Sequence, residues 1–190
     1  MSANARVASV VLAAGTGTRF GHTMNKVWLQ LNGKHIISRS LANSVAPFSN
    51  VRSILVINPD DETFARDALA QDEMPTSIEI VHGGASRHES EYKALQYLKA
   101  DILAGNIDLV LIHDGARPLA TPQVFAAIAD GAHTHGGAIP TIALNELEMD
   151  TARDETVARV QTWLYRHRYR CLYGTVFPRC KDCCGSWRCI

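Results

Sequence analysis

The segment with the clearest chemical potential runs from residue 13 to residue 26. It reads Ala13-Ala14-Gly15-Thr16-Gly17-Thr18-Arg19-Phe20-Gly21, and Asn25 and Lys26 follow a few residues on. Glycines and alanines let backbone N–H groups approach phosphate oxygens, and a cation on the same loop can neutralise charge on a reacting phosphorus. The segment therefore predicts a phosphate-binding loop. A plain strand-to-helix turn is the alternative, because glycine commonly marks turns.

Two better-known glycine loops do not fit these residues. The dinucleotide fingerprint needs its third glycine three places after the second, and Gly21 comes one place late. The P-loop needs Lys and Ser or Thr after its last glycine, whereas His22 follows Gly21.

A second glycine segment reads Gly83-Gly84-Ala85-Ser86-Arg87-His88-Glu89-Ser90. A glycine backbone can lie against a nucleotide base while the Ser90 hydroxyl faces the base edge. The same residues also predict the start of a helix, with Ser86 as N-cap and Glu89 completing a capping box. Both interpretations can hold at once.

A third segment, His113-Asp114-Gly115-Ala116-Arg117-Pro118, follows an apolar run. An acid at the carboxyl end of a strand can position Mg²⁺ or its waters beside a triphosphate, and a nearby arginine can bind a second substrate's phosphate. The alternative is an exposed Asp–Arg pair of little energetic value.

Predicted strands and helices alternate along the chain, and they must position these three segments. Apolar, β-branched runs predict buried strands at Val7–Leu12, Val51–Ile57, Ile78–Val81 and Leu109–Ile112, with a fifth at Ala138–Ala143. Helical spacing predicts helices at Ile36–Val45, Glu62–Leu69, Glu89–Leu98 and Pro122–His133, the last with Thr121 as N-cap. Strand–helix alternation predicts a mainly parallel sheet, in which ligands bind beyond the carboxyl ends of the strands.

The composition is that of an ordinary globular domain. The 190 residues suit one compact unit, and 19 basic residues balance 19 acidic ones. This balance favours neither a nucleic-acid nor a membrane partner. The apolar run Val7–Gly15 after Arg6 is short for a signal peptide and leads into the glycine loop, so we expect a cytoplasmic protein.

The three segments together resemble the sugar- and polyol-phosphate nucleotidyltransferases, specifically the 2-C-methyl-D-erythritol 4-phosphate cytidylyltransferase family. The resemblance covers roughly residues 7 to 162 and includes a sequence like the family's His-Asp-Ala-Ala-Arg-Pro at residues 113–118. It implies a three-layer α/β/α fold, Rossmann-like, with a mainly parallel twisted sheet. It also implies transfer of CMP from CTP to a polyol phosphate with release of pyrophosphate, with ribitol 5-phosphate as the alternative acceptor. Intact relatives are expected to be homodimers.

The resemblance assigns roles to residues at matching positions. Arg19 and Lys26 would be catalytic cations that stabilise the pentacoordinate phosphorus. Gly84 and Ser90 would face the cytosine, and Asp114 and Arg117 would serve Mg²⁺ and the acceptor phosphate respectively. The remaining nucleotide-binding positions would be Ala13, Ala14, Gly15 and Gly17.

The chain departs from the family pattern toward its C-terminal end. Leu147 occupies a position where relatives place a hydroxyl, which puts the acceptor in doubt. We therefore expect a core over residues 1–144, an arm or loop over 145–162, and an atypical tail over 163–190 that is disordered or translated out of frame. Such a tail would leave a sheet edge uncovered, and we expect little turnover from the chain. A zinc site at Cys180, Cys183, Cys184 and Cys189 is the alternative for the tail.

Overall fold

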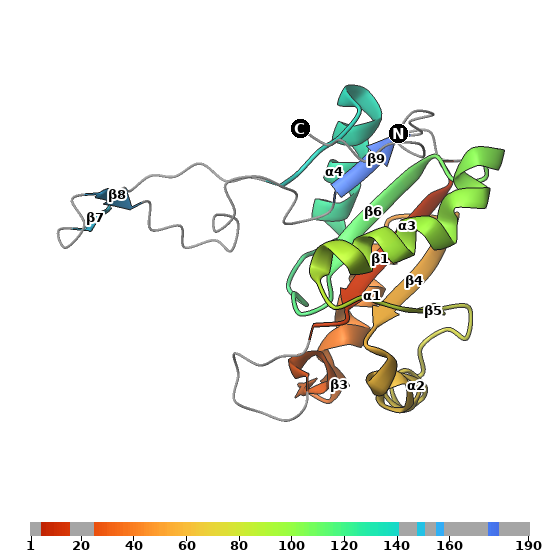
Figure 1. Cartoon of the computed structure of the whole chain (residues 1–190), viewed down its shortest axis with the longest axis vertical. Coiled ribbons are helices and arrows are strands. Elements are labelled where there is room, and N and C mark those ends of the chain that lie inside the picture. Colours follow the sequence, from red (N-terminus) through yellow and green to blue (C-terminus); the bar gives the residue numbers. More distant parts are fainter. Residues whose placement is uncertain (1–4, 16–24, 141–147, 151–154, 158–174, 179–190) are drawn as a thin grey trace.

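The computed structural model describes residues 5–15, 25–140, 148–150, 155–157 and 175–178. Within these residues a sheet has the order β5-β4-β1-β6-β9 (Figure 1). Its strands are β1 (Val7–Ala13), β4 (Val51–Ile57), β5 (Glu79–His82), β6 (Leu109–Asp114) and β9 (Thr175–Pro178). The first four are parallel, and β9 pairs with β6 in the antiparallel direction. The predicted α/β class with a mainly parallel sheet is confirmed.

Helices cover both faces of the sheet because the side chains of β1 alternate between two apolar clusters. On one face, Val10 and Leu12 pack with Ala94 and Leu98 of α3 (Arg87–Ala104). On the other face, Val11 packs among the buried residues of α1 (Ile36–Val45) and α2 (Glu62–Gln71). The helix α4 (Pro122–His135) lies over the same face as α1, against Val7 and the odd-numbered residues of β6. Figure 1 shows α3 crossing the sheet in front of β1.

Two helix starts follow the predicted capping residues. The Ser86 hydroxyl accepts a hydrogen bond from the Glu89 N–H at 3.1 Å, while the Glu89 carboxylate accepts one from Ala85 N–H at 2.9 Å. This is a capping box shifted by one residue, because the usual partner of the acid is the N-cap's own N–H. Thr121 is the N-cap of α4, without a side-chain capping bond, and Pro122 occupies the first turn.

A small hairpin after the glycine segment was not predicted. Its strands β2 (Gln30–Leu31) and β3 (Lys34–His35) are only two residues long, too short for a periodic pattern. Asn32 and Gly33 form the turn with φ values of 49° and 74°. An Asn-Gly pair with positive φ at both positions is the preferred two-residue hairpin connection. Two 3₁₀ turns, η2 (Lys26–Trp28) and η3 (Pro59–Asp61), were also missed.

The fifth strand of the sheet lies elsewhere than predicted. Residues 138–140 have no regular structure, and 141–143 lie outside the described residues. The edge of β6 is instead paired by β9, with Leu109 opposite Pro178. The expectation that the tail leaves this edge uncovered is therefore wrong for Thr175–Pro178. In the arm, β7 (Glu148–Asp150) and β8 (Glu155–Val157) pair with each other.

No helix in the described part of the chain is both long and apolar enough to cross a bilayer.

Candidate active site

The three chemical segments meet at the carboxyl edge of the sheet. The chain runs from β1 to β4 on one side and later adds β6 on the other, so the strand order reverses between β1 and β6. Leu12 lies opposite Asp114 in the β1–β6 register, and the Gly115 N–H donates to the Leu12 carbonyl at 2.8 Å. Such a reversal point is where open α/β sheets bind ligands.

Two glycines allow the loops to approach one another. A Cβ on Gly115 would lie 2.6 Å from Ile37 Cδ1 and 2.9 Å from the Leu12 carbonyl oxygen. A Cβ on Gly83 would lie 2.5 Å from the Ala14 Cβ. Because contacts this short require backbone movement, glycine at these two positions holds the second and third segments against the first.

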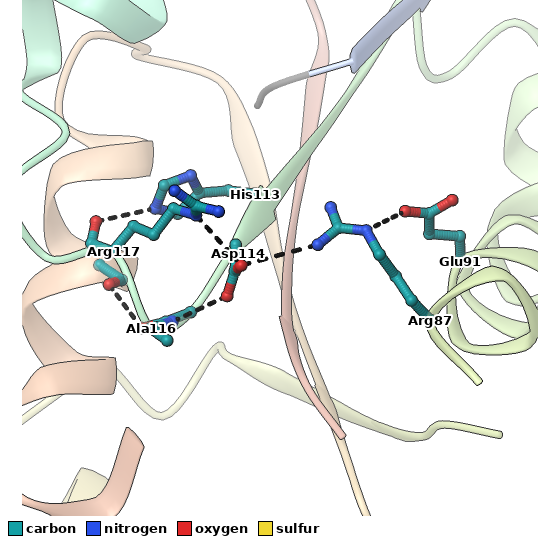
Figure 2. Close-up of polar contacts among 8 residues, drawn as sticks. Arg87, Glu91, His113, Asp114, Ala116 and Arg117 are labelled. Carbon is teal, nitrogen blue, oxygen red and sulfur yellow. Dashed lines mark hydrogen bonds and ion pairs between the residues drawn. The ribbon is translucent and has the colours of Figure 1, made fainter. Parts of the chain in front are cut away.

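Asp114, the last residue of β6, is the centre of a charged cluster (Figure 2). Its Oδ1 accepts a hydrogen bond from the Ala116 N–H, and its Oδ2 accepts one from Arg117 Nε, both at 3.1 Å. Burial opposes ionisation, but the Ala116 N–H and the charges of Arg117 and Arg87 hold the pKa of Asp114 below its usual value. The carboxylate is therefore an anion at neutral pH.

Arg87 brings a second cation to this carboxylate from the other side of β1. It is the first residue of α3, and its Nη1 lies 3.6 Å from Asp114 Oδ2. Its Nε donates to the Glu91 carboxylate one turn along the helix, at 2.9 Å. Figure 2 shows Arg87 reaching toward Asp114 while it is anchored by Glu91. This pair links the segment after β5 to the segment after β6.

His113 lies in the core directly before Asp114. Its side chain is 1% exposed and makes an edge-on contact with Phe125, with ring centroids 4.9 Å apart. Burial lowers the pKa of His113 to about 4, so the ring is neutral at neutral pH. Its Nε2 lies 3.2 Å from the Arg117 carbonyl, which can only accept, so Nε2 carries the proton. Through this hydrogen bond, the His113 ring holds the backbone of the loop at Arg117 in place.

A sequence model of the family described as IspD, 2-C-methyl-D-erythritol 4-phosphate cytidylyltransferase, matches residues 7–164. The chain belongs to this family. A relative from Cereibacter sphaeroides carrying the family's name is 37% identical over 139 residues, which is 73% of this chain and 59% of that protein. A protein from Rhodobacter capsulatus named bifunctional enzyme IspD/IspF is 38% identical over 141 residues, 74% of this chain and 34% of its own length. The chain thus spans less than two thirds of these relatives.

Solved IspD structures share the fold. The 2-C-methyl-D-erythritol 4-phosphate cytidylyltransferase from Thermus thermophilus aligns with a TM-score of 0.57 at 21% identity, covering 92% of this chain and 71% of that one. The bifunctional IspDF from Campylobacter jejuni aligns with a TM-score of 0.64 at 18% identity, covering 92% of this chain and 41% of that one. At these identities the likeness supports the architecture alone.

The IspD-type glycine segment is described only at its two ends. Ala13 ends β1, and Ala14 and Gly15 follow it, with Gly15 exposed. Gly17 and Arg19 lie outside the described residues. Lys26 is exposed as the first residue of η2. Its predicted catalytic role stays a prediction.

In the second glycine segment, residues 83–90, Ser90 has a structural role as well as its predicted contact with cytosine. The side chain is buried, and its hydroxyl accepts from the Gly84 N–H at 3.0 Å and donates to the Ser86 carbonyl at 2.9 Å. A Cβ on Gly84 would meet the Glu89 side chain at 2.2 Å. Ser90 therefore fixes the backbone of Gly84, and the contact of either residue with a base remains a prediction.

Sequence reasoning missed two residues that organise this site. Arg87 gave no signal, because its partner Asp114 lies 27 positions away and the helix that aims it was predicted to begin two residues later. In the sequence, Asn25 was noted only as the residue before Lys26, with no role of its own. Its amide contacts the other end of the glycine segment, and only tertiary structure brings those two ends together.

The residues at Asp114 fit a magnesium ion shared with a nucleotide, without forming a complete cage. The described residues contain no group of three or more His, Cys, Asp or Glu side chains suited to a metal. Mg²⁺ at nucleotide sites commonly uses one or two carboxylates and takes its other ligands from phosphates and water. Asp114 can supply one such carboxylate. The cysteines considered for zinc lie outside the described residues.

Proposed function

We propose that this chain is built to transfer CMP from CTP to 2-C-methyl-D-erythritol 4-phosphate, with release of pyrophosphate. The observation that carries the proposal is the family match over residues 7–164. The fold supports it, because the segments that would hold triphosphate, base and acceptor lie at the carboxyl ends of the neighbouring strands β1 and β6.

The reaction requires positioning and positive charge more than proton transfer. The phosphate oxygen of the acceptor is already ionised at neutral pH, so it can attack the α-phosphorus without a general base, and pyrophosphate leaves. His113 is not needed as a base, since its buried ring is neutral and its proton is directed at the Arg117 carbonyl. Lys26 and Arg19 would stabilise charge on the pentacoordinate phosphorus.

Asp114 and Arg117 would bind the metal ion and the acceptor phosphate, respectively. Mg²⁺, when bound, supplies positive charge to the triphosphate, and Asp114 would hold it. Arg117 would bind the acceptor phosphate, and its Nε bond to Asp114 keeps its guanidinium beside the carboxyl end of β6. The cytoplasmic location and the homodimer expected for intact relatives stay predictions.

The test is a single-turnover assay with protein in excess over radiolabelled CTP, because the sequence predicts slow turnover. Labelled product should form when Mg²⁺ and 2-C-methyl-D-erythritol 4-phosphate are present, and removing Mg²⁺ or changing Asp114→Asn should abolish it. Calorimetry with CTP is run in parallel.

Three other outcomes would support a different conclusion. Product formed only with ribitol 5-phosphate would change the acceptor. CTP binding with no product from either acceptor would identify a nucleotide-binding protein without turnover. Failure to bind CTP would overturn the proposal as a whole.

A further inference from the structure

We propose that Asn25 is the positioning residue of the triphosphate site, and that it holds the phosphate-binding backbone and Lys26 in a fixed relation. This inference rests on the proposed function, since it concerns how CTP would be held. Asn25 is 8% exposed, and no role was assigned to it from the sequence.

Every polar group of the Asn25 side chain is used locally. Its Nδ2 donates to the Ala13 carbonyl at 2.8 Å and to the Gly15 carbonyl at 2.6 Å. Its Oδ1 accepts from the Val27 N–H at 3.4 Å and caps η2, whose first residue is Lys26. One side chain therefore joins the two ends of the glycine segment.

These bonds also determine where backbone donors point. The C=O and N–H of a trans peptide lie on opposite sides of the chain, and the described residues contain no cis peptide bond. Turning the Ala13 carbonyl toward Asn25 therefore turns the Ala14 N–H away from it. A phosphate-binding loop needs its N–H groups held in advance in this way, because donors that are already oriented lose less freedom when the anion arrives.

The position of Lys26 depends on the same side chain. Lys26 is exposed, and the turn that carries it begins at Asn25. When Asn25 is bonded to Ala13 and Gly15, the lysine is held at a set place relative to that backbone. Loss of the amide would free Lys26 and the backbone of residues 13–15 from each other, while the segment around Ser90 would keep its own hydrogen bonds.

The test compares Asn25→Ser with Asn58→Ser. Asn58 is a matched control, because it caps η3 with nearly the same backbone angles, φ −66° and ψ 137° against φ −64° and ψ 130° at Asn25. Serine can still cap a turn but cannot reach two carbonyls. Calorimetry measures the affinity of each protein for CTP and for cytidine, which lacks phosphates.

We expect Asn25→Ser to weaken CTP binding by about tenfold or more and to leave cytidine binding within about twofold, because two bonds that orient the phosphate loop are lost. Asn58→Ser should change neither affinity. Asn25→Asp should weaken CTP binding further, since its carboxylate would face two carbonyl oxygens. Equal losses for CTP and cytidine, or an Asn25→Ser protein that binds CTP like the unchanged chain, would overturn the inference.

A second measurement covers the case in which the variants do not fold. In the ¹⁵N-labelled unchanged protein, the Asn25 side-chain amide signal should shift on addition of CTP and stay in place on addition of cytidine. An unchanged signal with CTP bound would refute the inference and leave the proposed function standing. Absence of CTP binding to the unchanged protein would refute both.

Discussion

Arg87 Nη1 lies 3.6 Å from Asp114 Oδ2, although Arg87 comes after β5 and Asp114 ends β6, and these strands are separated in the sheet by β4 and β1. The contact exists because α3 crosses the sheet face and begins beside the end of β1. We expect Arg87→Gln to weaken CTP binding by about five- to tenfold, because a cation beside Asp114 would attract the triphosphate and both side chains are partly desolvated. Calorimetry at two salt concentrations measures this effect.

Arg66→Gln is the control for this change. Arg66 makes the same kind of ion pair one helical turn from Glu62, and its side chain is 65% exposed against 37% for Arg87. It should leave CTP affinity unchanged, as expected for an exposed pair. Equal losses in the two variants would show that Arg87 acts through general surface charge.

Lys26→Ala and Arg19→Ala should reduce the single-turnover rate by about 10²–10³ while changing CTP affinity much less, because both cations are assigned to charge that develops during the reaction. Lys34→Ala is the control, since Lys34 is an exposed lysine in the nearby hairpin. A variant with unchanged rate would remove that residue from the catalytic assignment.

Ser90→Ala should reduce the preference for CTP over UTP, because Ser90 holds the Gly84 backbone that would face the cytosine edge. Ser86→Ala, in the same segment, removes only the helix cap and should cost about 1 kcal/mol of stability without altering base preference. Competition binding with the two nucleotides measures both. The cytidylyl assignment would fail if the unchanged protein bound CTP and UTP equally well.

His113 should make the fold sensitive to mild acid. Burial lowers its pKa from 6.5 to about 4 in the folded chain, so protonation favours unfolding. The neutral ring's contribution is fully present above pH 6.5 and is lost as the pH falls toward 4. Over that range the loss amounts to about 3 kcal/mol.

Urea unfolding at several pH values tests this dependence. His113→Gln should lose less stability than the unchanged chain between pH 6.5 and 4. Parallel pH curves for His113→Gln and the unchanged chain would contradict the prediction.

The sequence determined the elements and the chemistry of this protein to a large extent. Buried β-branched runs identified four strands, because a strand covered on both faces leaves an unbroken apolar pattern, and Ile36–Val45 was predicted with its observed limits. The positions of the glycines also predicted loops at the carboxyl edge of the sheet. Their residue types pointed to phosphate and nucleotide chemistry before any contact was known.

Tertiary structure decided which residues work together. Arg87 meets Asp114, and Asn25 joins the two ends of the glycine segment, through contacts that no local pattern encodes. The strand at the β6 edge was also misplaced, because an edge strand needs only backbone hydrogen bonds from its neighbour. A short segment such as Thr175–Pro178 can supply those bonds without a distinctive sequence pattern.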